Sequence, residues 1–162
     1  MATNPGRNPA LRLLRIWRVL RTLPGGRWLF SRLLGWLVPY SGSIGANVRD
    51  IRPGYARLEL RERRKIRNHL RSVHAVALTN LGEYTSGLAL LAGLPGGTRG
   101  IPIRLSTEFH KKARGRLVAQ SRCEPPPITG KQDFEVYTEI HDARGDLVAR
   151  TVVCWRLAPL PA

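Results

Sequence analysis

The chain has 162 residues, 43% of them hydrophobic, which is enough for one domain with a buried core and argues against disorder over most of its length. Its 27 basic residues against 11 acidic ones give a formal charge of +16, and lysine occurs only at positions 65, 111, 112 and 131. Such an excess indicates an anionic partner (anionic lipid, a phosphorylated small molecule or nucleic acid) or a solvated basic surface. Arg32 interrupts the best apolar run, Trp28 to Val38, so no run reaches the ~20 residues of a membrane-spanning helix.

Cys123 and Cys154 both fall in strand-like runs, without the spacing of metal ligands or of a secreted disulfide framework. Arginines at 12, 15, 18 and 21 break any apolar core of a secretory signal. We therefore expect reduced thiols, no metal site and a cytoplasmic protein.

Residues 1–42 are predicted to form a basic, amphipathic, helical N-terminal extension. Apolar side chains recur at i, i+3, i+4 and i+7, the period of one helix face: Leu13, Ile16, Trp17 and Leu20. The Pro24-Gly25-Gly26 sequence ends this helix, and a second one is expected around Arg27 to Val38. Three interpretations stay open: the apolar face packs on the domain, lies on an anionic membrane surface at the periphery of the cell membrane, or serves in organelle targeting.

Residues 43–158 are predicted to form the main domain. From Ile44 the apolar period changes to two, and Ala56, Leu58 and Leu60 alternate with charged residues as in a strand with one wet face. Four later strands are expected over Ile101–Phe109, Arg116–Cys123, Phe134–His141 and Leu147–Leu157. The last two should form a hairpin around the turn sequence at 142–146.

A long helix is predicted between these groups of strands, from about Ser72 or His74 to Leu91. Its apolar positions surround it too widely for a surface helix, so it should be buried. The order of strand, strand, helix and a four-strand meander favours an α+β fold, an antiparallel sheet wrapped around one long central helix. Such a sheet leaves an edge strand that dimerisation would cover.

With these elements placed, the chain resembles the hotdog-fold acyl-CoA thioesterases, in particular the phenylacetyl-CoA thioesterase-like branch and a bacterial group of unassigned substrate. The resemblance covers roughly residues 23–157 and depends on Asn68-His69-x-x-Ser72-x-His74, on the later Glu83, on the Phe109–Gly115 segment and on the closing hairpin. In the better-known branch an Asn, a His followed by two glycines, and an Asp on the helix carry the chemistry. Asn68, His74 and Glu83 fall at those places, whereas Ala75-Val76 replaces the glycine pair and Arg71 stands where a small residue is usual.

The resemblance implies a homodimer, with pairing into a tetramer left open, and acyl-CoA as the ligand. No cofactor is expected beyond the coenzyme A of the substrate. The amides of Ala75 and Val76, at the positive end of the helix dipole, would hold the thioester oxyanion, and Glu83 would act as general base or nucleophile. Glu83 belongs to a polar stripe with Thr79, Asn80 and Ser86 that would face a pocket shared between subunits; alternatively it pairs with an arginine across the dimer.

The remaining candidates each have a structural alternative. His74 either takes part in catalysis or caps the helix, and Asn68 either orients the attacking water or closes a turn with its own backbone. Ser72 is a substrate contact or an N-cap. The cations of the loop after the expected strand Ile101–Phe109 bind the phosphates of coenzyme A or form a solvated face: Lys111, Lys112 and Arg114.

The function predicted from these residues is hydrolysis of a medium-chain, long-chain or aryl acyl-CoA. The alternative is a non-catalytic hotdog protein that binds acyl-CoA or lipid at an anionic membrane. Nucleic-acid binding has only the charge in its favour, because no zinc spacing, helix-turn-helix pattern or interleaved aromatic-basic motif accompanies it.

Overall fold

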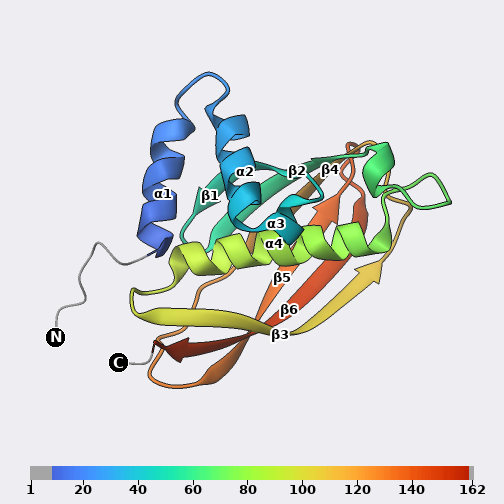
Figure 1. The fold of residues 1–162 in the computed structure, drawn as a ribbon. Coiled ribbons are helices and arrows are strands. Elements are labelled where there is room, and N and C mark those ends of the chain that lie inside the picture. The colour runs from blue at the N-terminus through green and yellow to red at the C-terminus, as the bar shows by residue number, and fades with distance from the viewer. Residues whose placement is uncertain (1–8, 161–162) are drawn as a thin grey trace.

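The computed structural model describes residues 9–160 of the chain (Figure 1). Its helices are α1 Pro9–Leu20, α2 Gly26–Leu37, α3 Pro39–Gly42 and α4 Ala75–Gly93, with a 3-10 turn, η2, at Arg64–Ile66. Its strands are β1 Asn47–Arg52, β2 Tyr55–Arg61, β3 Thr98–Phe109, β4 Arg116–Arg122, β5 Gln132–His141 and β6 Leu147–Pro159.

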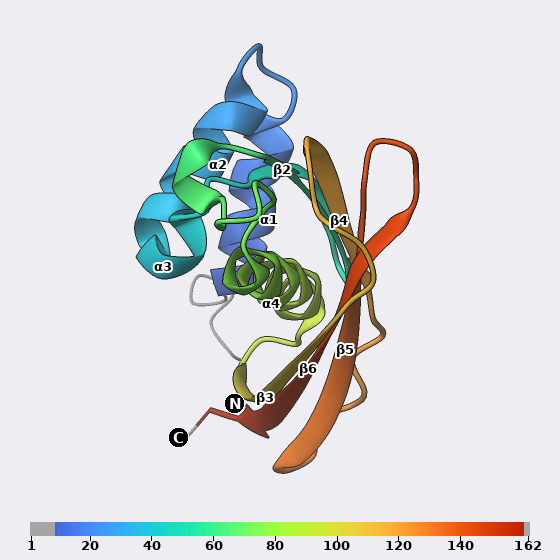
Figure 2. The ribbon, with the colours of Figure 1, turned by 90° about the vertical axis from the view of Figure 1, so that its right-hand side faces the viewer.

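The six strands form one antiparallel sheet in the order β1-β2-β4-β5-β6-β3. Figures 1 and 2 show the sheet curving around α4, with the N-terminal helices on the same side as α4. Residues on all sides of α4 are buried, as the spread of its apolar positions predicted. The predicted α+β fold, a sheet wrapped around one central helix, is confirmed.

The predicted four-strand meander is wrong for its first strand. β3 pairs with β6 along its whole length, from Thr98 opposite Pro159 to Phe109 opposite Ala149, and forms an edge of the sheet. The loop after β3 instead passes the start of α4, where the Val73 amide donates to the Ala113 carbonyl at 2.9 Å. Alternation of apolar residues identifies a strand but carries no information about its neighbours, which is why the meander was expected.

The first strand begins later than predicted. Ile44 and Ala46 are buried, but β1 starts at Asn47 because Gly45 turns the backbone with a φ of 65°. The Arg63 guanidinium donates to the Ile44 carbonyl at 2.5 Å and holds this approach in place. Apolar alternation here therefore reports burial rather than strand pairing.

The N-terminal helices pack on the domain through the apolar faces of α1 and α2. Leu14, Trp17, Phe30 and Leu34 join the main core, and the Trp17 and Phe30 rings meet edge to face with 5.0 Å between centroids. Of the three interpretations for this segment, packing on the domain is confirmed for these side chains.

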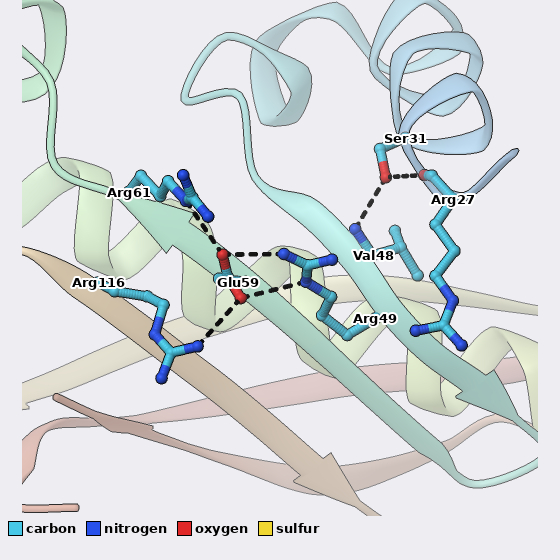
Figure 3. A network of polar contacts seen from close by, with 7 residues as sticks. All are labelled: Arg27, Ser31, Val48, Arg49, Glu59, Arg61 and Arg116. Atoms are coloured by element: carbon cyan, nitrogen blue, oxygen red, sulfur yellow. Dashed lines mark hydrogen bonds and ion pairs between the residues drawn. The ribbon is translucent and has the colours of Figure 1, made fainter. Parts of the chain in front are cut away.

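Helix α2 also covers the exposed edge of β1. The buried Ser31 hydroxyl donates to the Arg27 carbonyl at 2.7 Å and accepts from the Val48 amide at 2.9 Å (Figure 3). An edge strand has unpaired amides that invite pairing with another chain, and Ser31 satisfies one of them.

The outer face of the sheet has a buried carboxylate. Glu59 of β2 is only 5% exposed because three arginines cover it, with Arg49 at 2.9 Å, Arg61 at 3.3 Å and Arg116 at 3.8 Å (Figure 3). Burial opposes its ionisation, but the hydrogen bonds and charges of Arg49 and Arg61 outweigh burial and hold the pKa of Glu59 below its usual value. The outer face of the sheet, predicted to be solvent-exposed, is thus covered by arginine side chains at Glu59.

None of the helices described between residues 9 and 160 is both long enough and apolar enough to cross a membrane.

Candidate functional site

The approach to α4 is a tight turn organised by the side chain of Asn68. Its Oδ1 accepts from the amides of Leu70 and Ser72, at 3.0 and 3.2 Å, and from the Ser72 hydroxyl at 3.1 Å. The turn places Arg71 in the left-handed region, with a φ of 53° that a non-glycine residue rarely adopts. Asn68 therefore closes a turn with its own backbone, the structural alternative considered for it.

His74, not Ser72, is the N-cap of α4. Its Nδ1 accepts from the Val76 amide at 3.1 Å, so an amide expected to hold the oxyanion already has a partner. The Ala75 amide forms no hydrogen bond to any atom of residues 9–160. At the positive end of the α4 dipole, the Ala75 amide is therefore available to a ligand and the Val76 amide is not.

A hollow of about 340 Å³ lies beside this open amide, and we call it the Lys111 hollow. It is lined by Asn68, Leu70, Ser72, Val73, Ala75, Leu78, Phe109, His110, Lys111, Lys112 and Ala113. Its volume is at the lower end of the range for small-molecule sites, so it can hold a small ligand or one part of a larger ligand.

A second hollow, the Asn80 hollow, lies on another side of the same helix end. It is lined by Tyr40, Ser43, Ile44, Lys65, Ile66, Arg67, His74, Val76, Ala77 and Asn80. Asn80 donates from Nδ2 to the Tyr40 carbonyl at 3.2 Å, while its buried Oδ1 has no hydrogen-bond partner among the described residues. The predicted residues at the start of α4 are thus divided, with Asn68, Ser72 and Ala75 at the Lys111 hollow and His74, Val76 and Asn80 at the Asn80 hollow.

Glu83 is half-buried on α4 and lines neither hollow. Burial raises the pKa of its carboxyl group, and a hydrogen bond from the Ser41 side chain partly offsets this effect. No arginine or lysine of the described chain forms an ion pair with it. An ionised Glu83 is therefore held without a cation in a poorly solvated position.

The cations of the loop after β3 are not equivalent. Lys111 contacts Asp142 and Asp146 of the β5–β6 turn, at 2.6 and 2.5 Å, and these hydrogen bonds raise the pKa of Lys111. Lys112 and Arg114 are exposed and line a further hollow with Lys111, Asp142, Ala143 and Arg144. Lys112 and Arg114, unlike Lys111, form no ion pair among the described residues, although the charge of Arg114 helps to lower the pKa of Glu62.

Glu62 anchors the same loop to the turn before α4. It accepts from the Gly115 amide at 2.6 Å and from Arg67 at 2.6 Å, and these bonds lower the pKa of Glu62. The loop and the helix start are therefore held in one arrangement.

Several residues of the site have no recognisable signal in the sequence, or only a weak one. Tyr40 and Ser41 of α3 contact Asn80 and Glu83, some 40 positions away in the chain. No local sequence pattern predicts these contacts. His110 lines the Lys111 hollow directly after β3, and its place at a strand end was the available signal. No group of three or more potential metal ligands occurs among residues 9–160.

A sheet wrapped around one buried helix, with polar residues gathered at the start of that helix, defines the chain as a hotdog-fold protein, as its motifs indicated. The chain belongs to the family described as a domain of unknown function, DUF4442, whose model matches residues 26–157. No curated protein matches the chain.

Solved structures support this fold. A structural-genomics target is 27% identical over 91% of this chain and 99% of its own, with a TM-score of 0.79. A Pseudomonas aeruginosa protein of unknown function, termed a probable thioesterase, is 22% identical over 85% of this chain and 97% of its own, with a TM-score of 0.73. A Staphylococcus aureus thioesterase enzyme, solved as a mutant, is 14% identical over 75% and 99%, with a TM-score of 0.66.

Proposed function

We propose that the protein is a thioesterase that hydrolyses a medium-chain, long-chain or aryl acyl-CoA. The observation that carries this proposal is Glu83, a poorly solvated carboxylate without a cation and the only charged residue of α4. A desolvated carboxylate without a cation destabilises the folded state, and such groups are concentrated at functional sites. The raised pKa of Glu83 suits a general base that activates water. The P. aeruginosa and S. aureus proteins, which share the fold, are in keeping with this chemistry.

In this proposal the Ala75 amide holds the thioester carbonyl in the Lys111 hollow. Glu83 lies eight residues further along α4, about 12 Å at the rise of an α-helix, too far to act on the same carbonyl. The reaction therefore needs Glu83 from a second copy of the chain. Edge strand β3 offers the pairing surface, because Ile101, Leu105 and Phe109 are exposed on it.

The nucleotide end of coenzyme A would lie near Lys112 and Arg114, whose charges are not neutralised by the turn aspartates. Arginine can bind a phosphate bidentately, and the lysine adds a point charge.

The first experiment follows thiol release from acyl-CoAs, acetyl to palmitoyl plus phenylacetyl and benzoyl, with a chromogenic disulfide reagent. Glu83→Gln should lower kcat by about 10²- to 10⁴-fold, the usual contribution of a general base. Ala75→Pro removes the open amide at a position where proline is tolerated, since Ala75 begins the helix and His74 has an extended ψ of 141°. It should lower kcat by roughly 10²- to 10³-fold.

Mixing the two variants tests the shared site. A mixed dimer of Glu83→Gln and Ala75→Pro has one complete site if Glu83 serves the neighbouring subunit, so random mixing should restore roughly a quarter of wild-type activity. If both residues acted within one subunit, the mixture would stay inactive, and full activity of Glu83→Gln alone would refute the proposal altogether.

One observation favours the alternative of a non-catalytic protein that binds acyl-CoA or lipid. The Val76 amide is occupied by His74, so only the Ala75 amide of the predicted oxyanion pair is open. No thiol release on the whole panel, together with calorimetric binding of a thioether analogue of acyl-CoA, would establish this alternative.

A further inference from the structure

The outer face of α2 is apolar and exposed, although the opposite face of the helix is buried in the core. Trp28 is 61% exposed and Trp36 78%, and Leu29 and Leu33 lie between them on the same side of the helix. A run of two tryptophans and two leucines on one helix face is large for an uncovered surface of a soluble domain. We call these four residues the α2 face.

The surroundings of the α2 face are strongly cationic. Arg32 lies within it, and α1 contributes exposed Arg12, Arg15 and Arg18. The first acidic residue of the sequence is Asp50, and within the part of the chain that the structure describes no arginine of α1 or α2 forms an ion pair.

We propose that α1 and α2 dock the protein on the surface of an anionic lipid bilayer, with Trp28 and Trp36 in the headgroup region. Exposed tryptophans prefer the membrane–water interface, and nearby arginines add attraction to anionic headgroups. The helices would lie on the bilayer, since no described helix is suited to cross it.

A second copy of the chain suits this surface poorly. A two-fold interface places the same patch on itself, so the arginines of α1 and α2 would meet each other with no acidic side chain of the patch to compensate them. Anionic lipid supplies the missing charge. This inference does not depend on the proposed thioesterase activity.

The tryptophans provide a direct assay. Trp17 and Trp155 are buried at 1% and 3% exposure, so Trp28 and Trp36 are the two that vesicles can reach. Intrinsic fluorescence of the full chain should shift to the blue with phosphatidylcholine vesicles containing 30% phosphatidylglycerol, and brominated acyl chains should quench it. Pure phosphatidylcholine should have a much smaller effect. The Trp28→Phe/Trp36→Phe variant should still sediment with the anionic vesicles while losing the spectral change.

A charge-matched control separates this surface from the general charge of the protein. Arg12→Gln/Arg15→Gln/Arg18→Gln should reduce vesicle binding at least tenfold, because each arginine near an anionic surface contributes about fivefold. Arg57→Gln/Arg64→Gln/Arg99→Gln removes the same charge from other exposed positions and should reduce binding less than threefold. Equal losses in the two triple variants would overturn the proposal in favour of non-specific attraction.

Trp28→Ser/Trp36→Ser tests the apolar part and should also lower vesicle binding at least tenfold, with an unchanged molar mass in sedimentation equilibrium. A fall in molar mass with unchanged vesicle binding would overturn the proposal and identify the α2 face as a contact between copies. Thermal unfolding, followed by circular dichroism, verifies that each variant is folded.

Discussion

Gly82 is the point of closest approach between α4 and the sheet. A Cβ added at this position would lie 2.2 Å from Thr151 Oγ1 and 2.4 Å from Thr151 Cβ. Thr151 is fully buried on β6, an interior strand, and Thr138 donates to the Gly82 carbonyl at 3.0 Å. Because the Thr151 Cβ is fixed by its strand, Gly82→Ala must displace α4 or the strand itself.

The net effect can be worked out from these contacts. Carbon atoms prefer separations of about 3.5–4.0 Å, so the displacement is on the order of 1 Å. Overpacking of this kind costs about 1–3 kcal/mol, and weakening the Thr138 bond costs roughly 0.5–1.5 kcal/mol. Alanine recovers about 1 kcal/mol of helix propensity. We expect Gly82→Ala to lower the free energy of unfolding by about 0.5–3.5 kcal/mol.

Urea unfolding followed by circular dichroism measures this change, and Gly87 of the same helix is the matched control. A Cβ at Gly87 would lie 3.2 Å from the Trp155 ring, a contact that a small shift relieves. Gly87→Ala should therefore stay within about 1 kcal/mol of the wild type, because the gain in propensity opposes the contact. A Gly82→Ala variant as stable as the wild type would refute the reasoning.

Three further predictions concern charge and capping. Glu83→Gln should raise Tm at pH 7 but not at pH 4. A carboxyl group with a raised pKa stabilises the folded state when it is protonated and loses that contribution as pH rises. Calorimetry at the two pH values measures the difference in Tm. Glu59→Gln should cost about 1–2 kcal/mol at pH 7 rather than the larger cost of a fully buried pair, because its arginines are 37–71% exposed. The lowered pKa of Glu59 means that this contribution is present above the unfolded-state pKa and disappears as pH falls through the folded-state pKa, so urea titrations of both proteins should converge in acid. His74→Ala should cost about 0.5–2 kcal/mol by removing the N-cap, whereas His74→Asn should restore most of it; equal stability of the two variants would contradict the capping role.

The elements of the fold were largely predictable because their patterns are local. Apolar residues on all sides predicted a buried α4, and the 142–146 sequence predicted the β5–β6 turn, which Gly145 adopts with a φ of 88°. The position of β3 was not predictable, since strand pairing is decided by the path of loops and not by alternation. The burial of Glu59 was missed for a similar reason, because the arginines that cover it come from three different strands.

The candidate site was predictable in its residues and less so in their roles. Asn68 and His74 were each given a catalytic and a structural interpretation, and only the geometry shows which of their atoms bind backbone amides. The contact of Ser41 with Glu83 depends on how the N-terminal helices fold back over α4. Such long-range contacts leave no periodic signal in the sequence.

The strand order has a consequence for how the protein is made. β6 comes last of the six strands along the chain, yet it lies between β5 and β3. A nascent chain that has emerged only as far as Leu147 has every residue of β3 and β5 available but no strand to join them. The edges of β3 and β5 that pair with β6 therefore stay unpaired until β6 has been synthesised. During this time they are exposed to pairing with other chains and so to aggregation. Completion of the sheet is therefore tied to the final stretch of the domain, and a chain shortened before β6 would lose two strand pairings together.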